Sequence, residues 1–377
     1  MTVVCLGADA LDYPEGKGGG HTWVFLNWAL GLRAAGCRVI WLESEPPRIS
    51  REVARERLAI LTSFLKHHGL DEIALASSNG KPVGHLASDQ YLTVTEAAEE
   101  ADLLLDLGHN RSPAEVERFH RTAFVDIDPG LLQLWMVSGD TGGASYDRYF
   151  TIGETVGTER ARFPDGGFAW IYTPPPVFLE EWPVAVSEPE AAYTTVTHLY
   201  AGTVEIDGKE YNNDKRTAFL EYLDLPARAH QRLELALCLG TDDSQDRPLF
   251  EQAGWHVRDA WDVTSSPQDY ATYIRSSRGE FSCAKPSCFL LQNAWISDRT
   301  ICYLASGKPA IVEYTGSSRF LPDAEGLFRF RNLDEAAAML EAAESDYERH
   351  SRAARALAEE YFDATKVMTR VLEEALP

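Results

Sequence analysis

Long apolar runs are absent from this sequence. Nowhere do about 18 apolar residues follow one another without charge, so no segment is predicted to span a membrane. The chain also lacks a basic start, an apolar segment and a small-residue cleavage site, and a strand-like run begins already at residue 3. These absences predict a cytoplasmic protein without a signal peptide.

Cysteine is scarce, and the six cysteines include no CxxC pair that would indicate a metal site or a redox motif. Most of them lie in apolar stretches, where a free thiol behaves as a small hydrophobic side chain. We therefore expect reduced, buried cysteines. Short repeats and low-complexity tracts are absent as well.

Basic residues are outnumbered, because 35 Lys and Arg face 58 Asp and Glu and give a net charge of −23. Such a chain repels polyanions and anionic membrane surfaces, which disfavours a nucleic-acid-binding function. A small anionic ligand can still bind where the few basic residues converge. Nothing in the charge pattern predicts an oligomeric state.

The sequence does have the composition of a globular protein, with 45% hydrophobic, 11% aromatic and 25% charged residues. Its 377 residues suit two domains of middling size, because single hydrophobic cores stop growing near about 250–300 residues. We expect both domains to bury sizeable cores.

Short β-rich runs alternate with helical segments in the first half of the chain. Continuously apolar strands that alternate with helices indicate a parallel sheet covered on both faces. We therefore predict a Rossmann-like domain over residues 1–175. Its expected strands are residues 3–6, 38–42, 103–107, 123–127, 149–152 and 168–172, and its clearest helices are residues 22–35 and 49–68.

A proline-rich stretch follows and predicts a linker over residues 176–192, because it is too rigid and polar for a core element. The alternation of strands and helices then resumes and predicts a second Rossmann-like domain over residues 193–362. The expected fold class is thus α/β, with two doubly wound parallel-sheet domains that face a cleft. Ligands of such sheets bind beyond the carboxyl ends of the strands.

A glycine-rich loop, Gly16-Lys17-Gly18-Gly19-Gly20-His21, leads into the first long helix. Its glycines allow a ligand to approach the backbone, and the helix N-terminus favours an anion, so Gly19 and Gly20 are candidate donor or phosphate contacts. The loop fails as a GxGxxG dinucleotide motif, because His21 or Trp23 stands where the last glycine is required. Glu43, at the end of the second strand, favours a nicotinamide cofactor and leaves an oxidoreductase as an alternative.

Two segments resemble a known family. Gly-Gly-His before a helix, followed by Leu32-x3-Gly36-x2-Val39-Ile40-Trp41-Leu42, resembles the opening of GT-B glycosyltransferases. Residues 297–312, SDRTICYLASGKPAIV, are similar to the donor-binding helix and strand of that fold, which typically has the pattern E-A-x-A-x-G-x-P-V-V.

The resemblance covers nearly the whole chain in element order. It implies a GT-B-like fold with an acceptor domain, a donor-binding domain and a C-terminal helix, residues 363–377, that crosses back onto the first domain. It also implies a nucleotide-diphosphate-sugar as co-substrate and no other cofactor. One departure is that the E-x7-E pair, which holds the donor in many members, falls on Ala294 and Cys302.

Two helix starts carry the candidate donor contacts. The charge of a leaving diphosphate is neutralised by a metal, by Arg or Lys, or by a helix N-terminus. Helix capping and a solvated first turn are the structural alternatives for these residues, in which Asp214 caps the helix that Lys215 begins. Arg299 is the strongest single candidate, because helix entry, motif position and charge coincide there. The full candidate set is Lys215, Arg216, Ser297, Asp298, Arg299 and Thr300.

His21 is the candidate general base, because an acceptor hydroxyl loses a proton as it attacks the anomeric carbon. Some GT-B enzymes use a histidine at this point, so the resemblance supports this role. The alternative is a histidine that caps the helix or contacts a backbone carbonyl. His109, expected at a strand end on the same side, is the second candidate.

Asp126 and Asp128 follow an apolar run and form a DxD pattern, which is the metal signature of another transferase fold, GT-A. The Pro129-Gly130 that follows is explained if Asp128 caps a short helix. We therefore expect no metal site and treat Asp126 and Asp128 as structural or as facing the acceptor. Trp135 is a candidate acceptor contact, and Trp295 has the same chemistry.

Together these patterns predict a hexosyltransferase-like glycosyltransferase that moves a sugar from a nucleotide-diphosphate donor to a small-molecule acceptor without a metal. Two alternatives stay open. One is the nicotinamide-dependent oxidoreductase, and the other is a GT-B-fold protein that binds a nucleotide-sugar without turnover.

Overall fold

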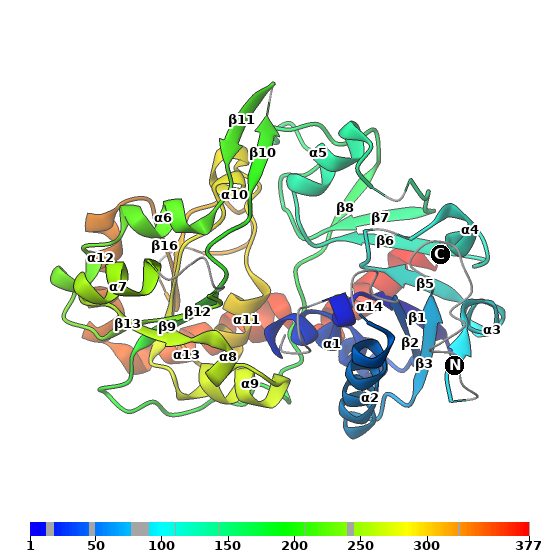
Figure 1. Cartoon of the computed structure of the whole chain (residues 1–377), viewed down its shortest axis with the longest axis horizontal. Helices are drawn as coiled ribbons and strands as arrows, with labels where there is room; N and C mark the ends of the chain where they lie inside the picture. The colour runs from blue at the N-terminus through cyan, green and yellow to red at the C-terminus, as the bar shows by residue number, and fades with distance from the viewer. Residues whose placement is uncertain are drawn as a thin grey trace. The chain divides into compact units, whose positions relative to one another are not determined.

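The chain folds into two compact units (Figure 1). The computed structural model describes residues 1–12, 19–44, 50–76, 90–109, 111–141, 143–206, 208–239, 245–322 and 325–376. Unit 1 consists of Met1–Gly153, Pro164–Phe178 and Ala364–Pro377, and unit 2 consists of Glu154–Phe163 and Leu179–Asp363.

The segment Glu154–Phe163 belongs to unit 2, whereas the sequence placed it within the first domain. Its side chains explain the difference. Glu154 is buried and accepts hydrogen bonds from the backbone N–H of Arg319, at 2.6 Å, and from the Ser318 hydroxyl, at 2.5 Å. A buried carboxylate with such partners is held firmly in the unit that supplies them.

Unit 1 is built on an eight-stranded sheet in which neighbouring strands are all parallel, in the order β4-β3-β2-β1-β5-β6-β7-β8. The order reverses between β1 and β5, and such a reversal opens a ligand-binding crevice at the carboxyl ends of the strands. The strands are β1 (Val3–Ala8), β2 (Arg38–Ser44), β3 (Glu72–Ala76), β4 (Leu92–Thr93), β5 (Leu103–Asp106), β6 (Thr122–Asp126), β7 (Arg148–Thr151) and β8 (Trp170–Tyr172).

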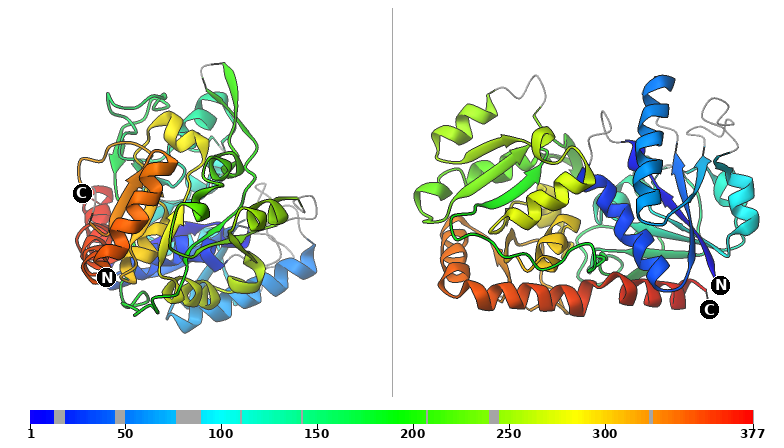
Figure 2. Two further views of the ribbon diagram at one scale, coloured as in Figure 1. Left: turned by 90° about the vertical axis from the view of Figure 1, so that its left-hand side faces the viewer. Right: turned by 90° about the horizontal axis from the view of Figure 1, so that it is seen from below.

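Helices cover this sheet, and the last helix of the chain lies beside the first, as Figure 2 shows. Gly31 makes the close approach possible, because a Cβ there would come within 2.8 Å of both the Ala364 carbonyl oxygen and the Met368 side chain. The helices are α1 (Gly19–Ala34), α2 (Arg51–His67), α3 (Val94–Glu100), α4 (Pro113–Val116), α5 (Leu131–Ser138) and α14 (Ala364–Ala375), with a short 3₁₀ turn at Ala10–Asp12.

Unit 2 has a six-stranded parallel sheet in the order β13-β12-β9-β14-β15-β16, which reverses between β9 and β14. A separate antiparallel hairpin, β10 (Thr203–Ile206) and β11 (Lys209–Asn212), follows β9. The strands of the sheet are β9 (Tyr193–Thr197), β12 (Leu233–Leu237), β13 (His256–Asp259), β14 (Gly279–Ser282), β15 (Ala310–Glu313) and β16 (Leu327–Phe330).

One face of this sheet carries an aromatic core, in which the buried rings of Phe281 and Phe330 stack with centroids 5.2 Å apart. The surrounding helices are α6 (Lys215–Glu221), α7 (Asp246–Gln252), α8 (Ala260–Val263), α9 (Pro267–Ser276), α10 (Pro286–Leu291), α11 (Asp298–Ala305), α12 (Leu333–Ser345) and α13 (Tyr347–Leu357), with a 3₁₀ turn at Leu225–Ala227 and a π-helical turn at Ala358–Phe362.

The expectation of free, buried cysteines is met except at Cys238. All six cysteines are free, and five are buried while Cys238 is partly exposed. Within the described part of the chain, no helix is both long and apolar enough to cross a membrane.

Candidate active site

In unit 2, three cationic side chains come together where α6, α10 and α11 begin. Asn213, just before α6, accepts a hydrogen bond from the Ser287 backbone N–H in α10 at 2.9 Å, which fixes these two helix starts beside each other. Lys215 thereby lies within electrostatic range of Lys285 and Arg299. Three basic side chains at one point of a chain with a net charge of −23 make this a candidate anion site.

Lys215 is the exceptional member of this group. Its side chain is largely buried, and burial lowers the pKa of its ammonium to about 7, with the charges of Arg299 and Lys285 lowering it further. Among the described residues, no hydrogen bond or ion pair engages this ammonium. A buried cation without an anionic partner is costly, so an anionic ligand would supply the missing interaction.

Arg299 is anchored inside the protein. Its Nε donates to the Glu280 carboxylate at 2.7 Å, and its Nη1 donates to the Val196 carbonyl at 3.1 Å. The Arg299 side chain is 10% exposed and that of Glu280 is fully buried. Because Val196 is in β9 and Glu280 in β14, Arg299 joins the two strands at which the sheet order reverses. Part of its charge is therefore already neutralised.

Arg216 is committed to another partner. It pairs with the buried Asp246 at 2.7 Å, and Asp246 also accepts a hydrogen bond from the Tyr200 hydroxyl at 2.7 Å. Asp214 stands at the N-cap position of α6 without capping it. Its side chain accepts hydrogen bonds from the backbone N–H groups of Ala201 and Gly202 instead. The capping alternative for Asp214 is therefore wrong, because the turn before the hairpin takes its carboxylate.

The start of α11 contains the other predicted donor residues. The Ser297 hydroxyl caps the helix by accepting from the Arg299 backbone N–H at 3.3 Å, as the structural alternative predicted. Asp298 opens the helix and is half-buried, and Thr300 is buried. Ser297 and Thr300 also line a small hollow beside Glu313, the last residue of β15.

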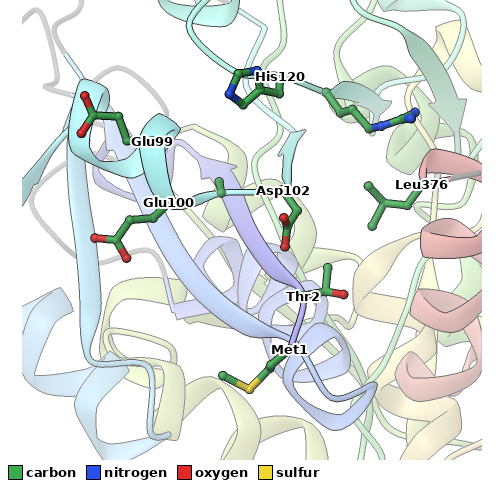
Figure 3. Close-up of a pocket in the computed structure, with 9 residues that line it drawn as sticks. Met1, Thr2, Glu99, Glu100, Asp102, His120 and Leu376 are labelled. Atoms are coloured by element: carbon green, nitrogen blue, oxygen red, sulfur yellow. The ribbon is translucent and has the colours of Figure 1, made fainter.

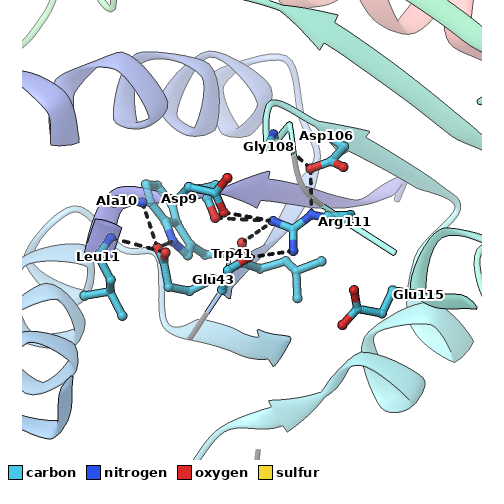
Figure 4. Close-up of polar contacts among 12 residues, drawn as sticks. Asp9, Ala10, Leu11, Trp41, Glu43, Asp106, Gly108, Arg111 and Glu115 are labelled. Atoms are coloured by element: carbon cyan, nitrogen blue, oxygen red, sulfur yellow. Dashed lines mark hydrogen bonds and ion pairs between the residues drawn. The ribbon is translucent and has the colours of Figure 1, made fainter. Parts of the chain in front are cut away.

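In unit 1, a buried arginine organises the carboxyl ends of three strands (Figure 4). Arg111 donates to Asp106 at 2.7 Å and to the carbonyl oxygens of Ala8 and Leu42 at 3.3 Å each. Tyr146 donates to the other oxygen of Asp106 at 2.6 Å. This network fixes the ends of β1, β2 and β5.

Glu43 lies in the same region and is completely buried. Its carboxylate accepts hydrogen bonds from Trp41 Nε1 at 3.0 Å and from the backbone N–H groups of Ala10 and Leu11 at 3.2 Å (Figure 4). Burial, followed by the charge of Asp9, raises the pKa of Glu43 to about 8. Because these donors enclose the carboxylate, it is not available to the ribose of a nicotinamide cofactor.

His21 lies in the first turn of α1, after Gly19 and Gly20. Its Nε2 is 3.0 Å from the backbone carbonyl oxygen of Asp9, so Nε2 carries the proton and Nδ1 is the basic nitrogen. The structural alternative, contact with a backbone carbonyl, is thus realised. Gly16, Lys17 and Gly18 lie outside the described residues.

Three other candidates of unit 1 lie together. His109 Nε2 is 3.9 Å from the Asp128 carboxylate, and the His109 ring contacts Trp135 edge to face with centroids 6.1 Å apart. His109 Nδ1 is buried and has no hydrogen-bond partner among the described residues. Trp135 is 36% exposed, which is high for a tryptophan.

Asp126 is fully enclosed by protein donors, and Gln133 Nε2, Thr151 Oγ1 and the Asp128 backbone N–H all bind it within 3.0 Å. Burial raises its pKa to about 6 although the hydrogen bonds oppose this. The prediction that Asp128 caps α5 is wrong. Gly130, with φ of 89°, takes the cap position, and the Gln133 side chain binds its N–H at 2.6 Å.

Sequence reasoning missed Arg111, Glu280, Lys285 and Glu313. Glu280 lies inside an apolar strand, and a charged residue within such a run signals a buried partner. No comparable signal exists for Arg111, because its hydrogen-bond partners other than Asp106 are 67 to 103 residues away along the chain.

A groove of about 640 Å³ lies elsewhere in unit 1 (Figure 3). It is at the amino ends of β1 and β5, and its lining includes Thr2, Glu99, Asp102 and His120. Ligands of parallel sheets bind at the carboxyl ends, so this groove is not the candidate site. No group of three or more His, Cys, Asp or Glu side chains suited to a metal ion occurs among the described residues.

Solved structures of other proteins share the architecture of this chain. HepE from Anabaena, in complex with UDP and glucose, matches with a TM-score of 0.59 and 11% identity, over 99% of each chain. The same protein in complex with UDP-glucose matches with a TM-score of 0.58 and 12% identity, again over 99% of each chain. The chain has the GT-B fold.

The GT-B fold places the candidate residues in its two Rossmann-like halves. Unit 2 carries the cationic residues and the hollow at Glu313, and unit 1 carries His21, the His109–Asp128 pair and Trp135. No family model matches the sequence. No curated protein matches it either.

Proposed function

We propose that the protein is a glycosyltransferase that moves a sugar from a nucleoside-diphosphate donor to a small-molecule acceptor. Unit 2 binds the donor, and unit 1 supplies the base and contacts the acceptor. The fold supports this proposal, since HepE, which shares it, has been solved with UDP, glucose and UDP-glucose.

The observation that carries the proposal is the ammonium of Lys215, which has no hydrogen-bond or ion-pair partner among the described residues and lies within electrostatic range of Arg299 and Lys285. A diphosphate leaving group develops negative charge in the transition state, and fixed cations in a site of low polarity stabilise that charge strongly. The start of α11, with the positive end of its helix dipole, and the hydroxyls of Ser297 and Thr300 complete the proposed donor site.

In this proposal the cations and helix starts neutralise the diphosphate, so catalysis needs no metal and no cofactor beyond the donor. The DxD carboxylates support this view, because Asp126 is enclosed by three protein donors and Asp128 lies beside His109. Activity is expected to persist in EDTA. Complete loss that Mn²⁺ reverses would return Asp126 and Asp128 to consideration as ligands.

His21 accepts the proton of the acceptor hydroxyl through Nδ1 while the Asp9 carbonyl holds its Nε2–H. Asp128 and the exposed ring of Trp135 contact the acceptor, the latter by stacking on an apolar or sugar surface. His109, beside both, is the second candidate base.

A binding protein without turnover is the second candidate function. One observation favours it, since Cys302, at an E-x7-E position, is buried and its thiol contacts the Asp298 carbonyl within α11. Nucleotide-sugar binding without transfer to any acceptor would support this alternative.

A thermal-shift panel of UDP, TDP, GDP and NAD tests the proposal. A ligand at about 100 times its dissociation constant adds roughly 2.7 kcal/mol of stability, which is readily measured. We expect a shift with one of the nucleoside diphosphates. A shift with NAD alone would contradict the proposal and support the oxidoreductase.

A further inference from the structure

A hollow of about 20 Å³ lies at the carboxyl ends of β14 and β15 in unit 2. This volume accommodates one water molecule or one hydroxyl group. Its lining includes one residue with a carboxylate, Glu313, and four residues with hydroxyl side chains, Ser282, Ser297, Thr300 and Thr315. The hollow is therefore suited to a polar ligand atom with several hydrogen-bonding partners.

One oxygen of Glu313 is fixed and the other is open. Oε2 accepts a hydrogen bond from the Ala284 backbone N–H at 2.9 Å, which orients the carboxyl group. Oε1 has no hydrogen-bond partner among the described residues, and this oxygen atom is not fully buried. Oε1 thus reaches the surface of the hollow as a pre-oriented acceptor.

The hollow adjoins the proposed diphosphate site. The buried Cys283 thiol lines the hollow, and its pKa is raised by burial and by the charge of Glu313 while Lys215 and Arg299 oppose the rise. Cys283 is therefore within electrostatic range of both Glu313 and the cations. Thr300, which follows Arg299 in the sequence, lines the hollow together with Glu313. A ligand whose diphosphate binds at Lys215 would therefore place the groups attached to the diphosphate near Glu313.

We propose that Glu313 accepts a hydrogen bond from a hydroxyl group of the nucleoside-diphosphate-sugar donor and so selects donors that carry this hydroxyl. The inference rests on the proposed function and adds a carboxylate that the motif E-x7-E does not supply in this chain. The hydroxyl belongs either to the ribose or to the transferred sugar. Burial raises the pKa of Glu313 to about 7, so its carboxyl also titrates near neutral pH.

The test is calorimetric titration of the full chain with inorganic pyrophosphate, UDP, the 2′-deoxy and 3′-deoxy analogues of UDP, and UDP-glucose. If the panel favours TDP or GDP, the corresponding ligands replace the uridine series. Each is measured with the wild type, with Glu313→Gln and with Glu221→Gln. The control Glu221→Gln is apt, since Glu221 is exposed, raises the pKa of Glu313 by its charge and does not line the hollow.

We expect Glu313→Gln to weaken each ligand that carries the recognised hydroxyl about 10-fold, as for a lost charge-assisted hydrogen bond. Pyrophosphate binding and the affinities of the Glu221→Gln variant are expected to be unaffected. If the ribose is the source, one deoxy analogue binds the wild type about 10-fold more weakly than UDP and does not respond to Glu313→Gln. If the sugar is the source, only UDP-glucose responds to Glu313→Gln.

Unchanged affinities for UDP and UDP-glucose in Glu313→Gln would overturn this inference. Pyrophosphate binding that depends on Lys215 would leave the proposed function intact in that case. Absence of binding by pyrophosphate and every nucleotide would overturn both. Melting temperatures of the variants separate these results from misfolding. If Glu313→Gln unfolds, the wild type alone decides. Its affinities for the deoxy analogues and for UDP-glucose are then each compared with its affinity for UDP, and equal affinities for all of them would overturn the inference.

Discussion

At the scale of single residues, the protonation of Lys215 links nucleotide binding to pH. In the free protein its pKa of about 7 lies below the ordinary lysine value of 10.5, because burial disfavours the charged form. A bound diphosphate favours the ammonium and raises this pKa. Binding therefore takes up to one proton above pH 7, and affinity falls as the pH rises from 7 toward 10.

Calorimetry in two buffers of different ionisation enthalpy measures this proton uptake. We expect uptake to approach one proton near pH 8.5 in the wild type and to disappear in Lys215→Met, which also corrects for protons on the phosphates. Equal uptake in the two proteins would show that Lys215 does not meet the diphosphate.

The pairing of Arg299 with Glu280 changes what substitution of Arg299 does. Arg299→Ala leaves the fully buried Glu280 carboxylate without its partner, and such a loss typically costs about 3–5 kcal/mol of stability. The double variant Arg299→Met with Glu280→Gln removes both charges and is expected to regain most of that loss. Urea denaturation of the single and double variants measures the difference.

Full stability in Arg299→Ala would show that the ion pair is dispensable. If the double variant Arg299→Met with Glu280→Gln is stable, a change in its affinity for nucleoside diphosphates is not caused by unfolding. If Arg299 also contacts the diphosphate, this variant binds nucleoside diphosphates more weakly while free nucleoside affinity is unchanged.

His21 is expected to act on turnover and not on the donor. His21→Ala should lower turnover at least about 100-fold, since general bases contribute typically 10²–10⁴-fold, with donor affinity and melting temperature little changed. Steady-state kinetics with the selected donor and an active acceptor provides the measurement. Near-normal turnover would transfer the role to His109, for which His109→Ala is the matching variant.

At the scale of elements, the contact between α1 and α14 depends on Gly31. A side chain there would overlap the backbone of Ala364, and overpacking of this kind costs typically about 1–3 kcal/mol. Gly31→Ala is expected to lower the urea midpoint of the protein. Ala34→Ser, on an exposed position of the same helix, is the control and should have little effect. An unchanged midpoint in Gly31→Ala would show that α14 is not held through this contact.

Elements with an apolar run or a long helical period could be predicted from the sequence, and others could not. The apolar runs that form β1 and β5 mark these strands, and the helix α2 is long enough to establish a period. The hairpin β10–β11 and the strand β16 were missed. Charged residues interrupt these strands, as the buried Arg329 does in β16.

The candidate site could be predicted from the sequence only in part, for a related physical reason. Lys215 and Ser297 lie at helix starts, which the sequence marks through neighbouring polar residues. The partners that decide their chemistry come from distant strands, as in the contact of Arg299 with Val196, 103 residues away. Such contacts follow from strand order, which propensities and periods do not specify.

At the scale of the whole molecule, the negative net charge and the local cluster of basic residues have opposite effects on the binding of a nucleotide. A net charge of −23 repels nucleotides at long range, and this repulsion is screened beyond about 10 Å at 0.1 M salt. Within that distance the cluster of Lys215, Lys285 and Arg299 dominates. The molecule is therefore expected to reject polyanions and to accept a small diphosphate at one point.

Calorimetric titration of UDP, or of the nucleoside diphosphate that the thermal-shift panel selects, into wild type and Lys215→Met tests the central claim most directly. We predict a loss of affinity of at least about 10-fold in Lys215→Met, as expected for a charge-assisted contact to phosphate. Lys66→Met, which removes an exposed lysine from α2 in unit 1, is expected to bind as the wild type does. Equal affinity in wild type and Lys215→Met would contradict the assignment of the donor site.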